Sequence, residues 1–227
     1  MRSVNSPGYG KFLELLNNDR EIYRRFLDHL TINVSEFFRN NQQWQVLEKE
    51  IMPMLINERS GLKIWSAGCS TGEEAYSLAI MCREKGIHLH DRILATDLDQ
   101  EVLAKAQQGL YSIKAVEGIP QPLRERYFRR EDNQYRVVDE IRRMVRFERH
   151  DLLRDWFTPD QDLILCRNVV IYFTEETKQN LYKKFTAALR PAGVIFIGST
   201  EQIFQSRELG LKTIATFFYR KDLPSQN

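Results

Sequence analysis

The stretch Ile64-Trp65-Ser66-Ala67-Gly68-Cys69-Ser70-Thr71-Gly72-Glu73-Glu74 determines the expected fold. It begins as a short apolar run, continues through a turn of small residues, and leads into a segment, Glu73 to Ile80, with helical character. Glycine permits backbone conformations closed to other residues and lets a ligand approach the chain closely. The first N–H groups of a helix are unpaired donors. A strand, a glycine turn and a helix start therefore predict a nucleotide or nucleoside site, with Gly68 at the ligand.

The side chains of this turn favour one class of ligand. Neither a G-x-G-x-x-G dinucleotide fingerprint nor a phosphate loop ending in Gly-Lys-Ser/Thr is present. No Lys or Arg occurs between residues 64 and 80, and Glu73 and Glu74 would repel a phosphate. A ligand with hydroxyls and a positive charge, such as S-adenosylmethionine, suits the turn better. The alternative is an ordinary turn in which Ser70 or Thr71 caps the helix and the glutamates favour its dipole.

Composition indicates one soluble globular domain, or one domain with a small appendage. The chain has 227 residues, is 42% hydrophobic and 28% charged, and has a formal net charge of +2, so bulk charge implies no nucleic-acid partner. The stretch 124–149 is nevertheless dense in arginine, which is either a solvated face or a surface for an acidic partner. These arginines are Arg124, Arg126, Arg129, Arg130, Arg136, Arg142, Arg143, Arg146 and Arg149.

The cysteines and histidines suggest neither a zinc site nor a disulfide framework. Cys69, Cys82 and Cys166 lack C-x-x-C spacing, and the four histidines form no metal-binding pattern. The N-terminus has no apolar signal region, and no apolar stretch approaches about 18 residues, the length of a membrane span. We therefore expect a reduced cytoplasmic setting, no bound metal and no direct membrane insertion.

Hydrophobic periodicity predicts strands that alternate with helices, which implies a parallel sheet covered on both faces. Residues 111–150 interrupt this rhythm and predict a helical lead-in, then a small antiparallel insert whose last strand returns to the main sheet. The expected strands span 62–66, 93–96, 163–166, 194–197 and 217–219. The expected helices span 9–30, 44–56 with an interruption near Pro53, 73–85, 100–108 and 175–189.

Polar groups follow four successive apolar strands. Ligands in such folds bind at the carboxyl ends of the strands, so these groups are expected to form one site. They are Gly68 to Glu74, Asp97-Leu98-Asp99, His150-Asp151-Leu152 and Arg167-Asn168.

Each of these groups has a possible role and an alternative. A carboxylate just past the second strand can accept both hydroxyls of a ribose; Asp97 is the better candidate, and Asp99 is expected to cap the next helix. The Asp151-Leu152 pair can contact an adenine, or it can be a plain loop. Arg167 follows a wholly apolar strand, so its charge is not expected to face a dry core unpaired.

Five segments resemble, in order and spacing, the chemotaxis receptor glutamate O-methyltransferases of the CheR family. The resemblance extends from about Leu27 to Arg220, and several motifs in register are more specific than any one of them. The segments are Thr31–Arg39, Ser70–Tyr76, Thr96–Asp99, Cys166–Phe173 and Gly198–Phe204.

The resemblance implies a Rossmann-like class I methyltransferase sheet of seven strands with helices on both faces and an antiparallel strand near 217–219 at one edge. It also implies a helical N-terminal segment over 1–60, a methyltransferase domain over 61–227 and a β-subdomain insert at about 120–148. The N-terminal segment is shortened relative to the family, in which several helices precede the Asn33 motif and contact the receptor. The insert turn at 130–134 is short and lacks glycine, as in members that bind no receptor C-terminal peptide.

The implied activity is transfer of a methyl group from S-adenosylmethionine to glutamate side chains on the cytoplasmic helices of chemoreceptors. The products are glutamate methyl esters and S-adenosylhomocysteine. We expect a cytoplasmic monomer that is recruited to membrane receptor arrays. The family's catalytic pair maps to Arg39 and Tyr172. Its cofactor contacts map to Asn33, Ser35, Arg39, Glu74, Asp97, Asp151, Leu152, Arg167 and Asn168.

The implied chemistry needs no general base, because a glutamate carboxylate is ionised at neutral pH and is itself the nucleophile. The enzyme must align the reacting atoms and exclude water. Arg39 can grip a carboxylate at two points, unless it pairs with Glu36 or another acid. Tyr172 can orient a reacting group, unless it is a core aromatic beside Phe173. Two other functions stay open: methylation of another substrate, such as RNA or a small acid, and a cofactor-sensing module without catalysis.

Overall fold

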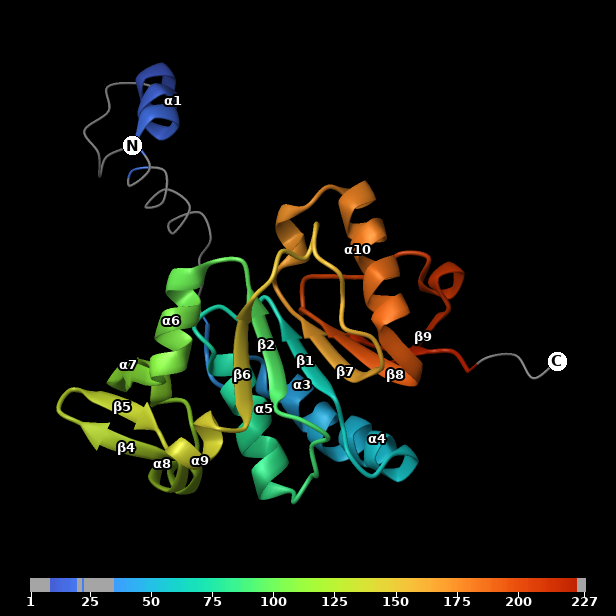
Figure 1. The fold of residues 1–227 in the computed structure, drawn as a ribbon, viewed down its shortest axis with the longest axis horizontal. Helices are drawn as coiled ribbons and strands as arrows, with labels where there is room; N and C mark the ends of the chain where they lie inside the picture. Colours follow the sequence, from blue (N-terminus) through green and yellow to red (C-terminus); the bar gives the residue numbers. More distant parts are fainter. Residues whose placement is uncertain (1–8, 20–21, 23–34, 224–227) are drawn as a thin grey trace. The chain divides into compact units, whose positions relative to one another are not determined.

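The fold is described from a computed structural model, which describes residues 9–19, 22 and 35–223 (Figure 1). The chain divides into two compact units, residues 1–34 and residues 35–227. The described part of the first unit is the helix α1 (Tyr9–Asn18), and the rest of the helix predicted over 9–30 lies almost entirely outside the described residues. The predicted domain boundary near residue 60 stays a prediction. No helix in the described ranges has the length and apolar character needed to cross a membrane.

A seven-stranded sheet forms the centre of the second unit. Its order is β6-β2-β1-β7-β8-β10-β9; the first five strands are parallel, and β10 is antiparallel to both of its neighbours. The predicted sheet and its antiparallel strand are therefore confirmed, although β9, an edge strand that the sequence did not predict, lies outside β10. The strands are β1 (Ile64–Ala67), β2 (Ile93–Asp97), β6 (Val145–Arg149), β7 (Gln161–Cys166), β8 (Leu189–Ile197), β9 (Leu211–Ala215) and β10 (Phe218–Lys221).

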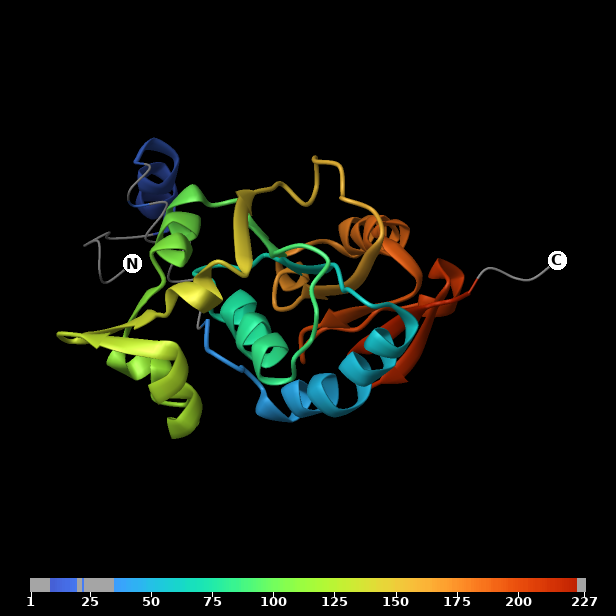
Figure 2. The same ribbon diagram turned by 60° about the horizontal axis from the view of Figure 1, so that its bottom comes forward.

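Helices cover both faces of the sheet, as Figure 2 shows with α3 to α5 and α10 on opposite sides. Successive strand residues point to opposite faces, so Ile64 and Trp65 belong to different core clusters. The first cluster includes residues of α3, α4 and α5; the second includes Leu181 and Phe185 of α10. The helices after residue 40 include α3 (Asn41–Val46), α4 (Met52–Glu58), α5 (Glu73–Glu84), α6 (Gln100–Gln108) and α10 (Glu175–Ala188).

The helix predicted over 44–56 forms with a wider turn in its middle. Between α3 and α4, residues Leu47–Ile51 form a single π-helical turn, η2. Pro53, in the first turn of α4, lacks an N–H, and its ring crowds the carbonyl four residues earlier. The π turn relieves that conflict without ending the helix, so the interruption predicted near Pro53 is a change of helical pitch.

The predicted antiparallel insert is a three-stranded sheet of order β3-β5-β4 with short helices beside it, next to β6 (Figure 1). A two-residue turn, Asp132-Asn133, joins β4 to β5, with Asp132 at φ 49°. The chain then returns to the main sheet through β6, which pairs with β2 as predicted. The elements are β3 (Leu110–Ser112), α7 (Ile113–Val116), α8 (Gln121–Tyr127), β4 (Phe128–Glu131), β5 (Gln134–Val137) and α9 (Asp139–Arg142).

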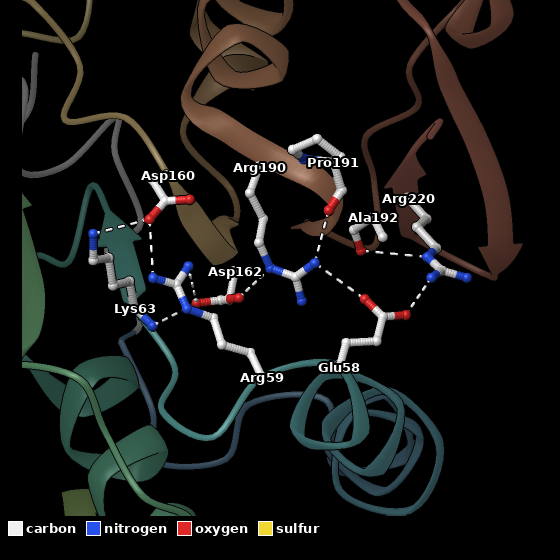
Figure 3. A network of polar contacts seen from close by, with 9 residues as sticks. All are labelled: Glu58, Arg59, Lys63, Asp160, Asp162, Arg190, Pro191, Ala192 and Arg220. Carbon is white, nitrogen blue, oxygen red and sulfur yellow. Dashed lines mark hydrogen bonds and ion pairs between the residues drawn. The ribbon is translucent and has the colours of Figure 1, made fainter. Parts of the chain in front are cut away.

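A network of charged side chains ties α4 to the amino ends of β7 and β8 (Figure 3). Asp162 is completely buried; it accepts the Lys63 backbone N–H at 2.8 Å and pairs with Arg190. Glu58, at the end of α4, pairs with Arg190 at 3.0 Å and with Arg220 of β10. The opposite, carboxyl ends of the parallel strands carry the predicted site.

Candidate cofactor and catalytic site

The glycine turn brings the ends of β1 and β2 together. The Gly68 N–H donates to the Thr96 carbonyl at 2.8 Å, and the Ser70 N–H donates to Oδ2 of Asp97 at 2.8 Å. Gly68 has φ +80°, and a Cβ there would stand 2.4 Å from Cγ2 of Val169, in the segment after β7. Glycine is therefore required both for the turn and for the close approach of the segment that follows β7.

The helix after this turn begins at a glycine and not at a hydroxyl residue. Gly72 is the N-cap of α5 at φ 93°, and no side chain caps the helix. The Thr71 hydroxyl instead donates to Oε2 of Glu73 at 2.7 Å. The alternative in which Ser70 or Thr71 caps the helix is therefore wrong, because the chain enters α5 through a left-handed residue.

Asp97 is oriented by backbone groups on both of its oxygens. Oδ2 receives the Ser70 N–H, and Oδ1 receives the Asp99 N–H at 3.1 Å. Each oxygen keeps a further lone pair, which is what two neighbouring hydroxyls require. Asp99 caps α6 by accepting the Glu101 N–H at 2.8 Å, so its predicted role is confirmed.

Leu98, between these two acids, is a candidate that the sequence analysis missed. Its side chain is 55% exposed at the end of β2. An apolar surface beside a carboxylate that can bind a diol suits the flat ring of a nucleoside. The sequence does hold a signal for Leu98, because it is an apolar residue between two acids directly after a strand.

The loop after β6 is held close to Asp97. The His150 N–H donates to the Asp97 carbonyl at 2.9 Å, which joins the ends of β6 and β2. Lys184 of α10 donates to the Leu152 carbonyl at 2.7 Å, so that carbonyl is already engaged. The Asp151 side chain remains 20% exposed. The loop therefore has a defined conformation, while its contact with an adenine stays a prediction.

Arg167 joins the glycine turn to the segment before α3. Its side chain is only 3% exposed; one nitrogen donates to Oε2 of Glu74 at 3.2 Å. The other terminal nitrogen donates to the Arg39 carbonyl at 2.9 Å and to Oδ1 of Asn40 at 3.1 Å. Glu74 also accepts the Ser66 hydroxyl at 2.7 Å. The Arg167 charge is thus paired, as predicted, and its internal partners are now identified; its contact with a cofactor stays a prediction.

The segment 35–40 places Arg39 at this junction. Phe37 anchors the segment, because its buried ring lies edge-on to Tyr111 at a centroid distance of 4.9 Å. Arg39 is half-buried, and its guanidinium forms no hydrogen bond or ion pair with any residue in the described ranges. The alternative of an ion pair with Glu36 is therefore wrong, and the guanidinium is left available to an anion.

The chain turns sharply after β7. Asn168 has φ +60°, and the 3-10 helix η3 (Val170–Tyr172) follows. The side chain of Tyr172 and all of Asn33 lie outside what the structure describes, so the pairing of Arg39 with Tyr172 stays a prediction. Ser35 is partly exposed at the start of the second unit, and its predicted contact is likewise untested.

The cysteine thiols near this site are not available as nucleophiles. Burial raises the pKa of the Cys69 thiol, and the nearby charge of Asp97 acts in the same direction. Burial also raises the pKa of Cys166. Neither thiol is ionised at neutral pH, and no group of His, Cys, Asp and Glu within the described ranges could hold a metal ion.

The arginine-rich stretch lies mainly on a solvated face. Arg126 pairs with Glu84 at 2.7 Å, and Arg136 pairs with Glu131 at 2.6 Å. A cavity of about 460 Å³ lies near the amino end of β6, away from the carboxyl ends of the strands, and four arginines line it: Arg92, Arg142, Arg143 and Arg146. The ion pairs favour the interpretation of a solvated face over that of an acidic-partner surface.

The acceptor groups at the strand ends fit a positively charged nucleoside. Asp97 offers two acceptor oxygens, and Glu74 offers a carboxylate whose charge is shared with Arg167. Leu98 offers an exposed apolar surface. The β1 turn has no basic side chain to hold a phosphate. These acceptors and this apolar surface suit S-adenosylmethionine, which has a ribose, an ammonium and a sulfonium.

Known proteins with similar sequences are named as methyltransferases. Residues 33–216 match the family model described as "CheR methyltransferase, SAM binding domain". A chemotaxis protein methyltransferase of Listeria innocua is 44% identical over 214 residues, which are 94% of this chain and 82% of that protein. Chemotaxis protein methyltransferase 2 of Pseudomonas aeruginosa is 35% identical, over 92% and 77% of the two chains. A chemotaxis protein methyltransferase of Borreliella burgdorferi is 33% identical, over 94% and 79%.

Proposed function

Because this chain belongs to the CheR methyltransferase family, we propose that it methylates glutamate side chains on the cytoplasmic helices of chemoreceptors. Membership makes it an S-adenosylmethionine-dependent methyltransferase of chemotaxis. What we propose is the acceptor group, a glutamate side chain, and the substrate protein, a chemoreceptor. The observation that carries it is the half-buried Arg39 guanidinium, which lacks a partner among the described residues. Arg167 binds both the Arg39 carbonyl and Glu74, which supports a place for Arg39 beside the proposed cofactor residues.

The residues at the strand ends would hold the cofactor. Asp97 would accept the ribose hydroxyls, Leu98 and Leu152 would contact the ring, and Glu74 would face the cationic part. When bound, S-adenosylmethionine supplies a methyl group activated by a sulfonium and leaves as S-adenosylhomocysteine. The remaining proposed contacts are Asn33, Ser35, Arg39, Gly68, Asp151, Arg167 and Asn168.

The protein's own contribution is alignment. A glutamate carboxylate has an ordinary pKa of about 4.3, so it is ionised at neutral pH and needs no base. Arg39 would orient it through a two-point contact, and the anchored Arg39 backbone limits how far that contact can drift. A grip that is too strong would stabilise the ground state and slow transfer, so the contact should be firm only in the reacting geometry. Tyr172 would make one further weak polar contact.

The partner and location follow from the same proposal. The protein would act as a cytoplasmic monomer recruited to membrane receptor arrays. The two-residue turn Asp132-Asn133 offers little backbone to an added peptide, which supports docking without a receptor C-terminal peptide. The division into a helical segment over 1–60 and a methyltransferase domain over 61–227, with an insert at about 120–148, belongs to this proposal too.

Arg39→Ala tests the proposal with labelled S-adenosylmethionine and purified receptor cytoplasmic fragments. Loss of one positioning contact is expected to slow methyl transfer by about a hundredfold, with cofactor binding retained by calorimetry. Glu36→Gln, three residues away on the same segment, is the matched control and should transfer at the native rate. A native rate in Arg39→Ala would remove Arg39 from the mechanism. Cofactor binding without any transfer by the unmodified protein would favour a cofactor-sensing module.

A further inference from the structure

Glu201 is a buried acid that lies behind the turn following β7. The residue is 7% exposed, and its Oε2 accepts the Gly198 N–H at 2.6 Å. Burial raises the pKa of Glu201, while the N–H groups of Gly198, Asn168, Val169 and Val170 act in the opposite direction and favour its ionised form. The carboxylate therefore faces backbone donors contributed by two separate strand ends.

The backbone of that turn has the form of an anion-binding nest. Asn168 is left-handed at φ +60°, and Val169 is right-handed at φ −105° and ψ −48°. Successive N–H groups in such a pair converge on one concave point, which binds an anion. A Cβ on Gly198 would stand 2.7 Å from the Asn168 nitrogen and 2.8 Å from Oε2 of Glu201, so the first N–H of the nest and the carboxylate both lie beside Gly198.

No cation accompanies this carboxylate. Within residues 35–223, no Lys or Arg forms an ion pair with Glu201, and its Oε1 has no hydrogen-bond partner. The Tyr182 hydroxyl of α10 is also buried without a partner, and the pKa of Tyr182 is raised first by burial and then by Glu201. A buried charge opposed only by backbone dipoles is costly for stability. Its position at the turn that carries predicted site residues points to a role in the reaction.

We propose that Glu201 is a positioning residue for methyl transfer, whose carboxylate lies against the nest at residues 168–170 and thereby holds the backbone turn that carries Asn168. Glu201 touches neither substrate nor cofactor; it acts through the backbone. The kinetic part of this inference rests on the proposed function, whereas the nest itself does not. Glu201→Gln keeps the size of the side chain but replaces one acceptor with a donor, which the converging N–H groups repel.

Hydrogen exchange measured by mass spectrometry on peptides that cover residues 166–172 tests the nest directly. Glu201→Gln is expected to lose amide protection there while its circular dichroism remains native. Glu208→Gln, an exposed glutamate in the same connection, is the matched control and should keep that protection. Unchanged protection in Glu201→Gln would overturn the proposal.

Kinetics with receptor fragments test the positioning role. The expected result is a kcat reduced by about tenfold to a hundredfold in Glu201→Gln, with receptor KM unchanged. Added formate is expected to recover part of the kcat of Glu201→Ala, since a small carboxylate can occupy the vacated nest. Lost protection with a native kcat would overturn the positioning role. Lost protection in a protein whose native form transfers no methyl group would instead refute the proposed function and leave the nest intact.

Discussion

At the scale of single residues, the site depends on side chains whose orientation is set by hydrogen bonds, several of them to the backbone. Asp97 is held by N–H groups on both oxygens, and Arg167 is held by Glu74 and by the Arg39 carbonyl. The sequence predicted which residue types stand at the strand ends, because polar residues that follow apolar runs are visible in it. It could not predict that Arg167 binds a carbonyl 128 positions away, since that contact exists only after folding.

Asp97→Ala is expected to abolish detectable S-adenosylmethionine binding in calorimetry, because it removes both the proposed ribose acceptor and the anchor of the Ser70 N–H. Asp99→Ala is the matched control two residues later. It removes the N-cap of α6 and should lower stability by about 0.5–2 kcal/mol while cofactor affinity remains. Near-native affinity in Asp97→Ala would show that the cofactor lies elsewhere.

Glu201 should also leave a signature in the pH dependence of stability. Its folded pKa is raised, so the folded protein holds the proton more tightly than the unfolded chain does. The unfolding free energy of the native protein, measured relative to Glu201→Gln, should therefore fall as pH rises from about 4.5 through the raised pKa. Urea unfolding of both proteins between pH 4 and pH 7 measures this difference. A difference that grows with pH would mean that the folded pKa is lowered.

At the scale of elements, apolar runs located the buried strands, and positions that depend on tertiary contact were missed. β1 and β7 are buried along their whole length and stand out as apolar segments. β9 was not predicted because Leu211–Ala215 is short and exposes Lys212 and Thr213. The start of α5 at Glu73 was predicted correctly, but its N-cap is Gly72, at a position where a Cβ would meet Ala106 at 2.9 Å.

The ion-pair network at the amino ends of β7 and β8 should contribute strongly to the unfolding free energy, because it holds α4 against the sheet. Asp162→Ala leaves Arg190 partly buried without its closest partner and frees the Lys63 N–H, so we expect a loss of about 3–5 kcal/mol. The control Glu140→Ala breaks an exposed pair with Arg83 and should cost about 0–1 kcal/mol. Denaturant titrations compare the two, and equal losses would contradict the assigned importance of Asp162.

At the scale of the whole molecule, the proposed site residues lie at the carboxyl ends of the parallel strands. The structural ion pairs lie at the amino ends. The turn after β1, Asp97, the Asp151 loop and the turn after β7 all stand at carboxyl ends, as the parallel order requires. The network of Glu58, Asp162 and Arg190 stands at the amino ends. This separation lets the site residues be substituted without loosening the sheet, which makes the functional tests interpretable.

The acceptor that we propose for the methyl group is a glutamate carboxylate of a receptor. The most direct measurement is incubation of the protein with methyl-labelled S-adenosylmethionine and receptor cytoplasmic fragments, followed by treatment of the labelled fragments with mild alkali. Methyl esters of glutamate hydrolyse in alkali, so we expect the label to be released as methanol and the Arg39→Ala protein to yield little label. A methyl label that stays on its acceptor after alkali would contradict the claim and identify a different substrate.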